Sequence, residues 1–66
     1  MTEYTIHLHD ENGTGYGHMD LDDNEIIYED LNEARMAAKS QLGGGIVLTR
    51  VIDRHTHRVV DFFEVE

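Results

Sequence analysis

Seven Asp and Glu residues lie between positions 20 and 33, and their carboxylates are close enough along the chain to imitate the phosphates of a nucleic acid. Side chains at positions i and i+2 of a strand lie on one face about 6.6–6.8 Å apart, close to the separation of successive phosphates on an extended strand. Asp20 and Asp22 have this spacing if residues 16–22 form a strand. Such a surface would fit a groove lined by Lys and Arg that normally holds a nucleic-acid backbone. The predicted partner-binding residues are Asp20, Asp22, Asp23, Glu25, Glu29, Asp30 and Glu33.

Calcium binding is a competing use for closely spaced carboxylates. A calcium loop needs oxygen ligands at positions 1, 3 and 5, Gly at position 6 and Glu at position 12. Counting from Asp20, position 6 is Glu25 and position 12 is Leu31. The pattern fails at the turn and at the bidentate ligand, so we predict no calcium site.

Two His-x-His pairs could offer imidazole nitrogens to zinc, nickel or copper. His7 and His9 would project from the same face of a strand, and His55 and His57 flank Thr56, while His18 stands apart. Neither pair has a third ligand at a fixed spacing. We therefore predict no metal ligands and no cofactor, and we keep a histidine-based metal-binding module as an alternative.

Catalysis is not expected of this chain. A domain of 66 residues buries only about 60% of its unfolded surface, which leaves little room for an internal catalytic cavity. The glycine-rich run 13–17 resembles a phosphate loop, but such loops lead into a helix and lie in positive potential. Here a strand is expected next and the neighbours are acidic. We predict a flexible hairpin turn, no catalytic residues and no enzyme activity.

The charge is segregated along the sequence. The first 34 residues contain ten Asp and Glu and no Lys or Arg, whereas all five basic residues lie between Arg35 and Arg58. A field of one sign attracts basic partners and repels nucleic acid and anionic membranes. We expect a basic protein partner, no direct nucleic acid and no membrane. An acidic surface kept for solubility is the simpler alternative.

The remaining composition indicates one soluble domain, residues 1–66. There is no Cys, hence no disulfide framework or thiolate site. No apolar run approaches the roughly 20 residues of a membrane span, and the start of the chain lacks a signal-peptide pattern. We expect a cytoplasmic protein that is a monomer or a weak dimer.

Alternating apolar residues predict a strand over 2–9, followed by a polar turn. A second strand is predicted over 16–21, although its glycines weaken the pattern. Residues 25–28 remain open between a short third strand and an irregular segment. After a glycine break, residues 46–52 and 58–65 are rich in β-branched residues and predict a second hairpin.

One helix is expected between these hairpins. Asp30 is a suitable N-cap with Glu33 three residues later, and apolar residues follow at helical spacing up to Gly43. The predicted fold is α+β: a small antiparallel sheet of four to five strands with one helix packed on a face, in the order ββ(β)αββ. The faces occupied by Val59 and Phe63 stay ambiguous, and one of these residues could lie at an interface. The predicted core consists of Tyr4, Ile6, Leu8, Leu31, Ala34, Ala38, Leu42, Ile46, Leu48, Val51, Val60 and Phe62.

The C-terminal half resembles the αββ portion of short phage and mobile-element proteins, through DLNEAR to Ala38, the glycine break, VIDR at 51–54 and RVV at 58–60. Among these are small anti-CRISPR proteins of type I systems. Small size, acidity and the lack of catalytic motifs are similar to anti-CRISPR proteins that act as DNA mimics, particularly against type I-C complexes. The resemblance implies a non-enzymatic inhibitor in the bacterial host cell that blocks target DNA, at the PAM-reading site of the large subunit. The site residues come from the charge pattern alone.

A second resemblance concerns the N-terminal strand and hairpin followed by a helix of the Leu-x-Glu-Ala type. This order is similar to HicB-like antitoxin domains, and it implies neutralisation of a basic ribonuclease toxin. The chain contains no Pro and no Cys, so it lacks the Pro-Gly-Cys-like segment of that family. Antitoxin function is therefore kept as an alternative.

Overall fold

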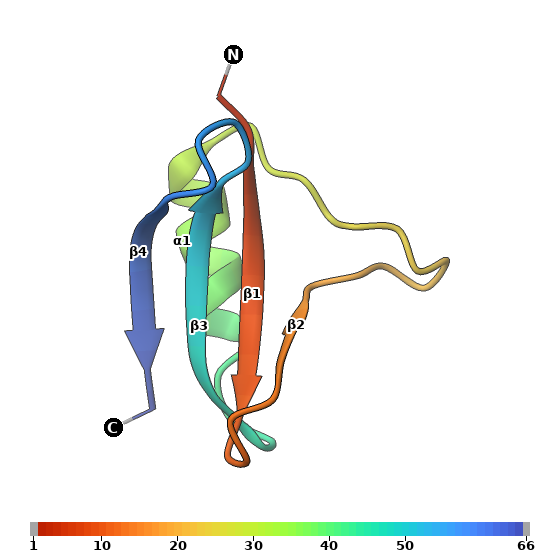
Figure 1. The fold of residues 1–66 in the computed structure, drawn as a ribbon, viewed down its shortest axis with the longest axis vertical. Helices are drawn as coiled ribbons and strands as arrows, with labels where there is room; N and C mark the ends of the chain where they lie inside the picture. Colours follow the sequence, from red (N-terminus) through yellow and green to blue (C-terminus); the bar gives the residue numbers. More distant parts are fainter. Residues whose placement is uncertain (1, 66) are drawn as a thin grey trace.

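The computed structural model describes residues 2–65, so the terminal residues of the predicted domain 1–66 lie outside the described part. It has one helix on one face of a four-stranded antiparallel sheet of order β2-β1-β3-β4 (Figure 1). This confirms the predicted α+β fold, with the order strand-strand-helix-strand-strand. The elements are β1 (Tyr4–Asp10), β2 (Gly15–Gly17), α1 (Leu31–Ser40), β3 (Ile46–Asp53) and β4 (Val59–Glu64).

The two central strands supply most of the core. Ile6 pairs with Val51, and Leu8 pairs with Thr49, so these side chains share the face that α1 covers. Ile6 is only 1% exposed and Val51 is fully buried. The buried Thr49 hydroxyl donates a hydrogen bond to the Ala38 carbonyl of the helix at 3.0 Å. This bond supplies the partner that a buried polar group requires.

The helix begins and packs as its sequence predicts. Asp30 has extended backbone angles, and its side chain accepts a hydrogen bond from the Asn32 amide at 2.8 Å, which caps the helix. Ala34 and Ala38 are fully buried. Their short side chains let the helix backbone lie close to the sheet.

The core prediction is wrong for Val60 and Phe62, which are 42% and 56% exposed. It is also wrong for Leu48, which pairs with Glu64 on the uncovered face and lies outside the core cluster. The register sets Phe63 opposite Thr49, on the helix side, and Phe62 opposite Arg50, on the uncovered face. A register shift between Val51 and Ile52 adds an irregularity at the start of β4. Both odd and even positions of this strand are apolar, so the sequence pattern did not show which side chains face the helix.

The second strand is shorter than predicted, because β2 ends at Gly17 rather than near Leu21. Residues 25–28 form no strand of their own. Tyr28 instead makes an isolated bridge with Tyr4, in which each amide donates to the other carbonyl, at 2.7 and 2.9 Å. Within residues 2–65, no helix combines the length and apolar character needed to cross a membrane.

Candidate functional site

The predicted acidic residues lie mainly on a projecting segment, residues 18–30, which we call the acidic arm. It leaves the sheet after β2 and extends well beyond the sheet edge before returning toward α1 (Figure 1). The His18 amide donates to the Ile6 carbonyl at 3.0 Å, and Tyr28 is bonded to Tyr4. Both ends of the arm are therefore fastened to the same strand, β1.

The tip of the arm is organised by one carboxylate. Asp20 Oδ1 accepts hydrogen bonds from the amides of Asp22 and Asn24, at 2.8 and 3.0 Å. This is the side-chain-to-backbone turn that favours Asp in loops. Asp20 therefore holds the turn, while the side chains of Asp22 and Asp23 are exposed.

The regular spacing expected of Asp20 and Asp22 is not present, since neither residue lies on a strand. Asp23 has a φ of 63°, a left-handed conformation that Asp tolerates better than most residues. The tip carboxylates thus form a cluster around a turn rather than a row along a strand.

Three of the predicted residues lie around the helix start, and two of them, Glu29 and Asp30, are the last residues of the arm. Asp30 caps the helix, Glu33 lies in its first turn, and Glu29 is exposed just before it. Figure 1 shows this end of α1 well separated from the tip of the arm. The structure divides the seven residues into two groups, with Glu25 between them on the returning half of the arm.

Glu25 connects the arm to the turn between β3 and β4. Arg54 Nε lies 3.2 Å from Glu25 Oε1, and Arg54 Nη1 lies 2.8 Å from Glu3 Oε1. The side chains are all more than a third exposed, so each pair is worth about 0.2–1 kcal/mol. Two carboxylates around one guanidinium leave this cluster with a negative charge.

The other carboxylates of the arm take part in none of the ion pairs among residues 2–65. Across residues 2–65, ion pairs involve only Arg54 and the Arg35–Asp61 pair, whose Nε and Oδ2 atoms lie 2.8 Å apart. Asp22, Asp23 and Glu29 are exposed and outside these pairs. They can therefore present their charge to a partner.

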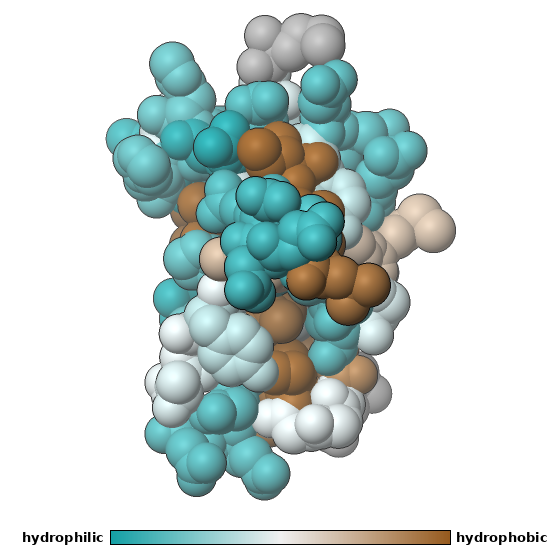
Figure 2. Space-filling view, turned by 90° about the vertical axis from the view of Figure 1, so that its right-hand side faces the viewer, coloured by the Kyte–Doolittle hydropathy of each residue, from teal (hydrophilic) through white to brown (hydrophobic). Residues whose placement is uncertain are grey.

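Apolar side chains accompany these charges. Leu21, between two Asp residues at the tip, is fully exposed, and Met19 and Ile27 are more than 40% exposed. Figure 2 views the molecule from the side of the arm, where hydrophilic side chains cover the centre and apolar ones emerge beside them. Charge reasoning did not single out Leu21, although an apolar residue inside the Asp-rich run 20–23 was a visible signal.

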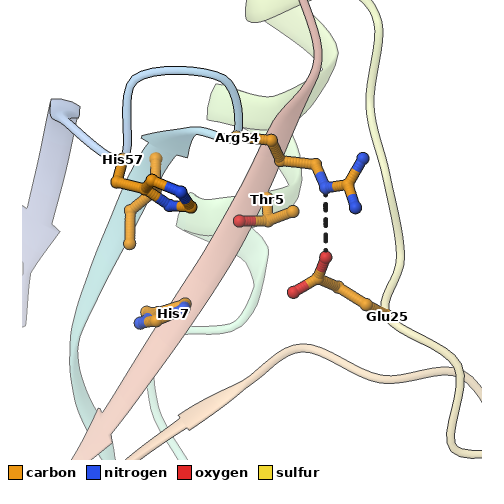
Figure 3. A pocket seen from close by; sticks show the side chains of 6 residues that line it. Thr5, His7, Glu25, Arg54 and His57 are labelled. Atoms are coloured by element: carbon orange, nitrogen blue, oxygen red, sulfur yellow. Dashed lines mark hydrogen bonds and ion pairs between the residues drawn. The ribbon is translucent and has the colours of Figure 1, made fainter.

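A pocket of about 280 Å³ lies on the sheet face opposite the helix, beside the Glu25–Arg54 pair (Figure 3). Thr5 and His7 come from β1, and His57 comes from the turn before β4 with a φ of 60°. No nucleophile–base hydrogen bond occurs among these side chains in the described chain. The lining residues are Thr5, His7, Glu25, Ile52, Arg54 and His57.

The two histidines of the first pair have different surroundings. His7 lines the pocket, whereas the His9 ring lies against Gly15, where an added Cβ would come within 2.8 Å of its Cε1 atom. His9 Nε2 is buried without a hydrogen-bond partner. Within residues 2–65, no three His, Asp or Glu side chains gather in an arrangement that could hold a metal ion.

One tyrosine at the base of the arm has a shifted pKa. Burial raises the pKa of the Tyr28 hydroxyl above its ordinary value, and the negative charge of Glu33 raises it further. The helix start and the end of the arm therefore interact electrostatically.

Comparisons with protein-family profiles, with curated proteins and with solved structures found no match to this chain.

Proposed function

We propose that the chain is a non-enzymatic inhibitor whose acidic arm occupies a Lys- and Arg-lined groove of a nucleic-acid-binding protein. The observation that carries this proposal is the projecting arm with exposed carboxylates that are outside the ion pairs of residues 2–65. A groove that binds a nucleic-acid backbone gains affinity by neutralising phosphates. Carboxylates on a projecting loop can enter such a groove and compete for the same cations.

The arm supports mimicry through its summed field rather than through a copied phosphate spacing. Asp22 and Asp23 cluster at a turn, and Glu29 lies nearer the helix. Clustered charge steers association and raises the association rate even without a repeated spacing. We therefore expect binding that depends on several carboxylates together and weakens with salt.

Leu21 gives the arm an apolar contact at its tip. It is fully exposed between Asp20 and Asp22. An apolar anchor surrounded by polar residues is the usual composition of a binding surface, in which a few desolvated side chains contribute most of the affinity. Loss of Leu21 should therefore raise the dissociation rate, whereas loss of the charges should lower the association rate.

The partner proposed from the resemblance is a type I CRISPR surveillance complex, with the groove at the PAM-reading site of its large subunit. The test uses a type I-C complex and a labelled target DNA, with and without the chain. Asp22→Lys with Glu29→Lys should restore DNA binding, because both residues are exposed and outside the described ion pairs. Asp20 and Glu25 are left unchanged, since they hold the arm.

The matched control is Glu11→Lys with Glu64→Lys, which changes the net charge by the same amount at exposed positions outside the arm. This control should inhibit like the parent chain. Equal inhibition by the parent and both variants would contradict the proposal. Equal loss in both variants would show that only net charge matters and that the arm is not the contact.

A further inference from the structure

The two edges of the sheet differ in length and apolar character. β2 has three residues and leads directly into the acidic arm. β4 has six residues of sequence VVDFFE, without Pro or Lys, and no other element of residues 2–65 lies beyond it (Figure 1). A long apolar edge presents unpaired N–H and C=O groups, which are a template for another strand. β4 is therefore the edge at which a strand can add.

The backbone groups of Phe62 and Glu64 point away from β3. The Val65 amide donates to the Val47 carbonyl at 3.0 Å. Hydrogen-bonded and non-hydrogen-bonded pairs alternate along an antiparallel ladder, so Phe63 also bonds to β3, while its two neighbours occupy the positions that face outward.

Phe62 is suited to an interface by both its backbone and its side chain. Its amide bonds only locally among the described residues, to Asp61 Oδ1 at 2.8 Å. Phe62 is 56% exposed, and its side chain lies on the uncovered face of the sheet. A strand added at this edge would supply a backbone partner and cover the ring.

We propose that two copies of this chain associate by antiparallel pairing of their β4 strands about a two-fold axis at Phe62. Phe62 then lies opposite Phe62 of the second copy, and the two residues exchange their outward N–H and C=O bonds. Glu64 lies opposite Val60, where the register shift makes the start of β4 irregular, so the regular pairing centres on residues 61–63 of each copy. The two sheets become one continuous sheet, with both helices on the same face.

Charge selects this register over its neighbour. With Phe62 at the axis, Asp61 lies opposite Phe63 of the second copy. In each copy the Lys39 ammonium lies over the Phe63 ring, with Nζ 5.1 Å from the ring centre. A negative side chain thus comes near a positive one. With Asp61 at the axis, two carboxylates would face each other, which is unfavourable.

The same arrangement keeps the acidic arms apart, because each arm lies beyond the β2 edge of its own sheet (Figure 1). Each chain carries a formal net charge of −9, and like charge opposes association. Pairing at β4 joins the copies at the edge farthest from the arms. The inference stands independently of the proposed function of the arm.

Sedimentation of the full chain between about 10 and 500 µM, a range in which mass action reveals weak dimers, tests the association. The weight-average mass should rise with concentration toward that of a dimer. Phe62→Lys should remain monomeric, because the two substituted lysines would lie opposite each other at the axis and repel. Leu21→Lys, at the arm tip, is the matched control and should dimerise like the parent. A parent chain that stays monomeric throughout, or a Phe62→Lys chain that still dimerises, would overturn the proposal.

Cysteine variants test the register, since the chain contains no Cys of its own. Phe62→Cys should form a disulfide-linked dimer on mild oxidation, because opposed hydrogen-bonded residues have Cα atoms about 5.5 Å apart, within the range of a disulfide. Glu64→Cys is the control: its copies would be offset by four residues, roughly 14 Å along the strands, and should not cross-link. Preferential cross-linking of Glu64→Cys would rule out this register.

Discussion

The layer between α1 and the sheet and the acidic arm are held by different interactions. The layer is stabilised by burial: Ile6, Val51 and the two alanines of the helix are almost completely removed from water. The arm has exposed side chains and is held by backbone bonds to β1, by the turn around Asp20 and by the Glu25–Arg54 pair. The layer therefore determines the stability of the fold, whereas the arm determines where carboxylates are exposed on the surface.

A carboxylate in this chain is therefore not always a charge available for binding. Asp10, Asp20 and Asp53 each use Oδ1 to accept two backbone amides in a turn. Their main role is to shape loops. Asp22 and Glu29 make no comparable bond among residues 2–65, which makes them better candidates for contact.

The largest effect is expected in the layer. Ile6→Ala should lower the free energy of unfolding by about 2–5 kcal/mol, because it leaves a cavity beneath the helix. Chemical denaturation followed by circular dichroism measures this change. Ile27→Ala, at an exposed arm position, is the control and should cost far less. Similar losses of unfolding free energy in the two variants would contradict the view that burial in the layer, and not the arm, stabilises the fold.

A smaller effect is expected at the hydrogen bond from Thr49 to the helix. Thr49→Val keeps the shape but removes the bond to the Ala38 carbonyl, and it should cost about 0.5–1.5 kcal/mol. That carbonyl also accepts from the Gln41 amide, so it is not left without a partner. The same denaturation measurement applies, with exposed Thr14→Val as the control. A loss at Thr14 as large as that at Thr49 would show that the buried bond contributes nothing specific.

The ion pairs of Arg54 join the arm to the rest of the fold, so their removal should loosen the arm. Arg54→Gln should cost under about 1 kcal/mol overall, since the pairs are exposed. It should also speed hydrogen exchange of the Ile26 amide, which bonds to the His18 carbonyl within the arm. Arg50→Gln, outside the described ion pairs, should change neither quantity. Unchanged exchange in Arg54→Gln would mean that the backbone bonds alone hold the arm.

The smallest effect concerns alkaline pH. The folded pKa of Tyr28 is raised by burial and by Glu33, above an unfolded value of about 10. Its contribution to stability is therefore complete below about pH 10 and is lost as pH rises through the folded pKa. Denaturation curves measured across this range should show a shallower decline for Tyr28→Phe, and an intermediate one for Glu33→Gln. Equal declines in the parent and Tyr28→Phe would contradict the assignment.

The helix and the three long strands follow from local signals. Asp30 and the alanine spacing locate α1, and alternation or β-branched runs locate β1, β3 and β4 within one or two residues. The glycines of the second strand gave a weaker signal, and Asp20 draws the following amides into a turn, so strand pairing stops at Gly17. Side-chain bonds to nearby amides compete with strand pairing and leave no periodic pattern.

The arrangement of the candidate site was less accessible to sequence reasoning. That Glu25 would meet Arg54, 29 residues away, depends on the return of the arm across the sheet edge. The inward position of Phe63 and the outward position of Phe62 depend on the register with β3. Such choices follow from tertiary pairing, which local patterns do not encode.

Both ends of the arm are bonded to β1, and this affects which sequence changes the fold can tolerate. The closure free energy of a flexible loop changes by only about 0.6 kcal/mol for each doubling of its length. As long as the backbone bonds from His18 to Ile6 and between Tyr28 and Tyr4 are kept, insertions or deletions between residues 18 and 28 do not change the buried layer. The arm can therefore change length and charge at little thermodynamic cost while the chain keeps the same fold.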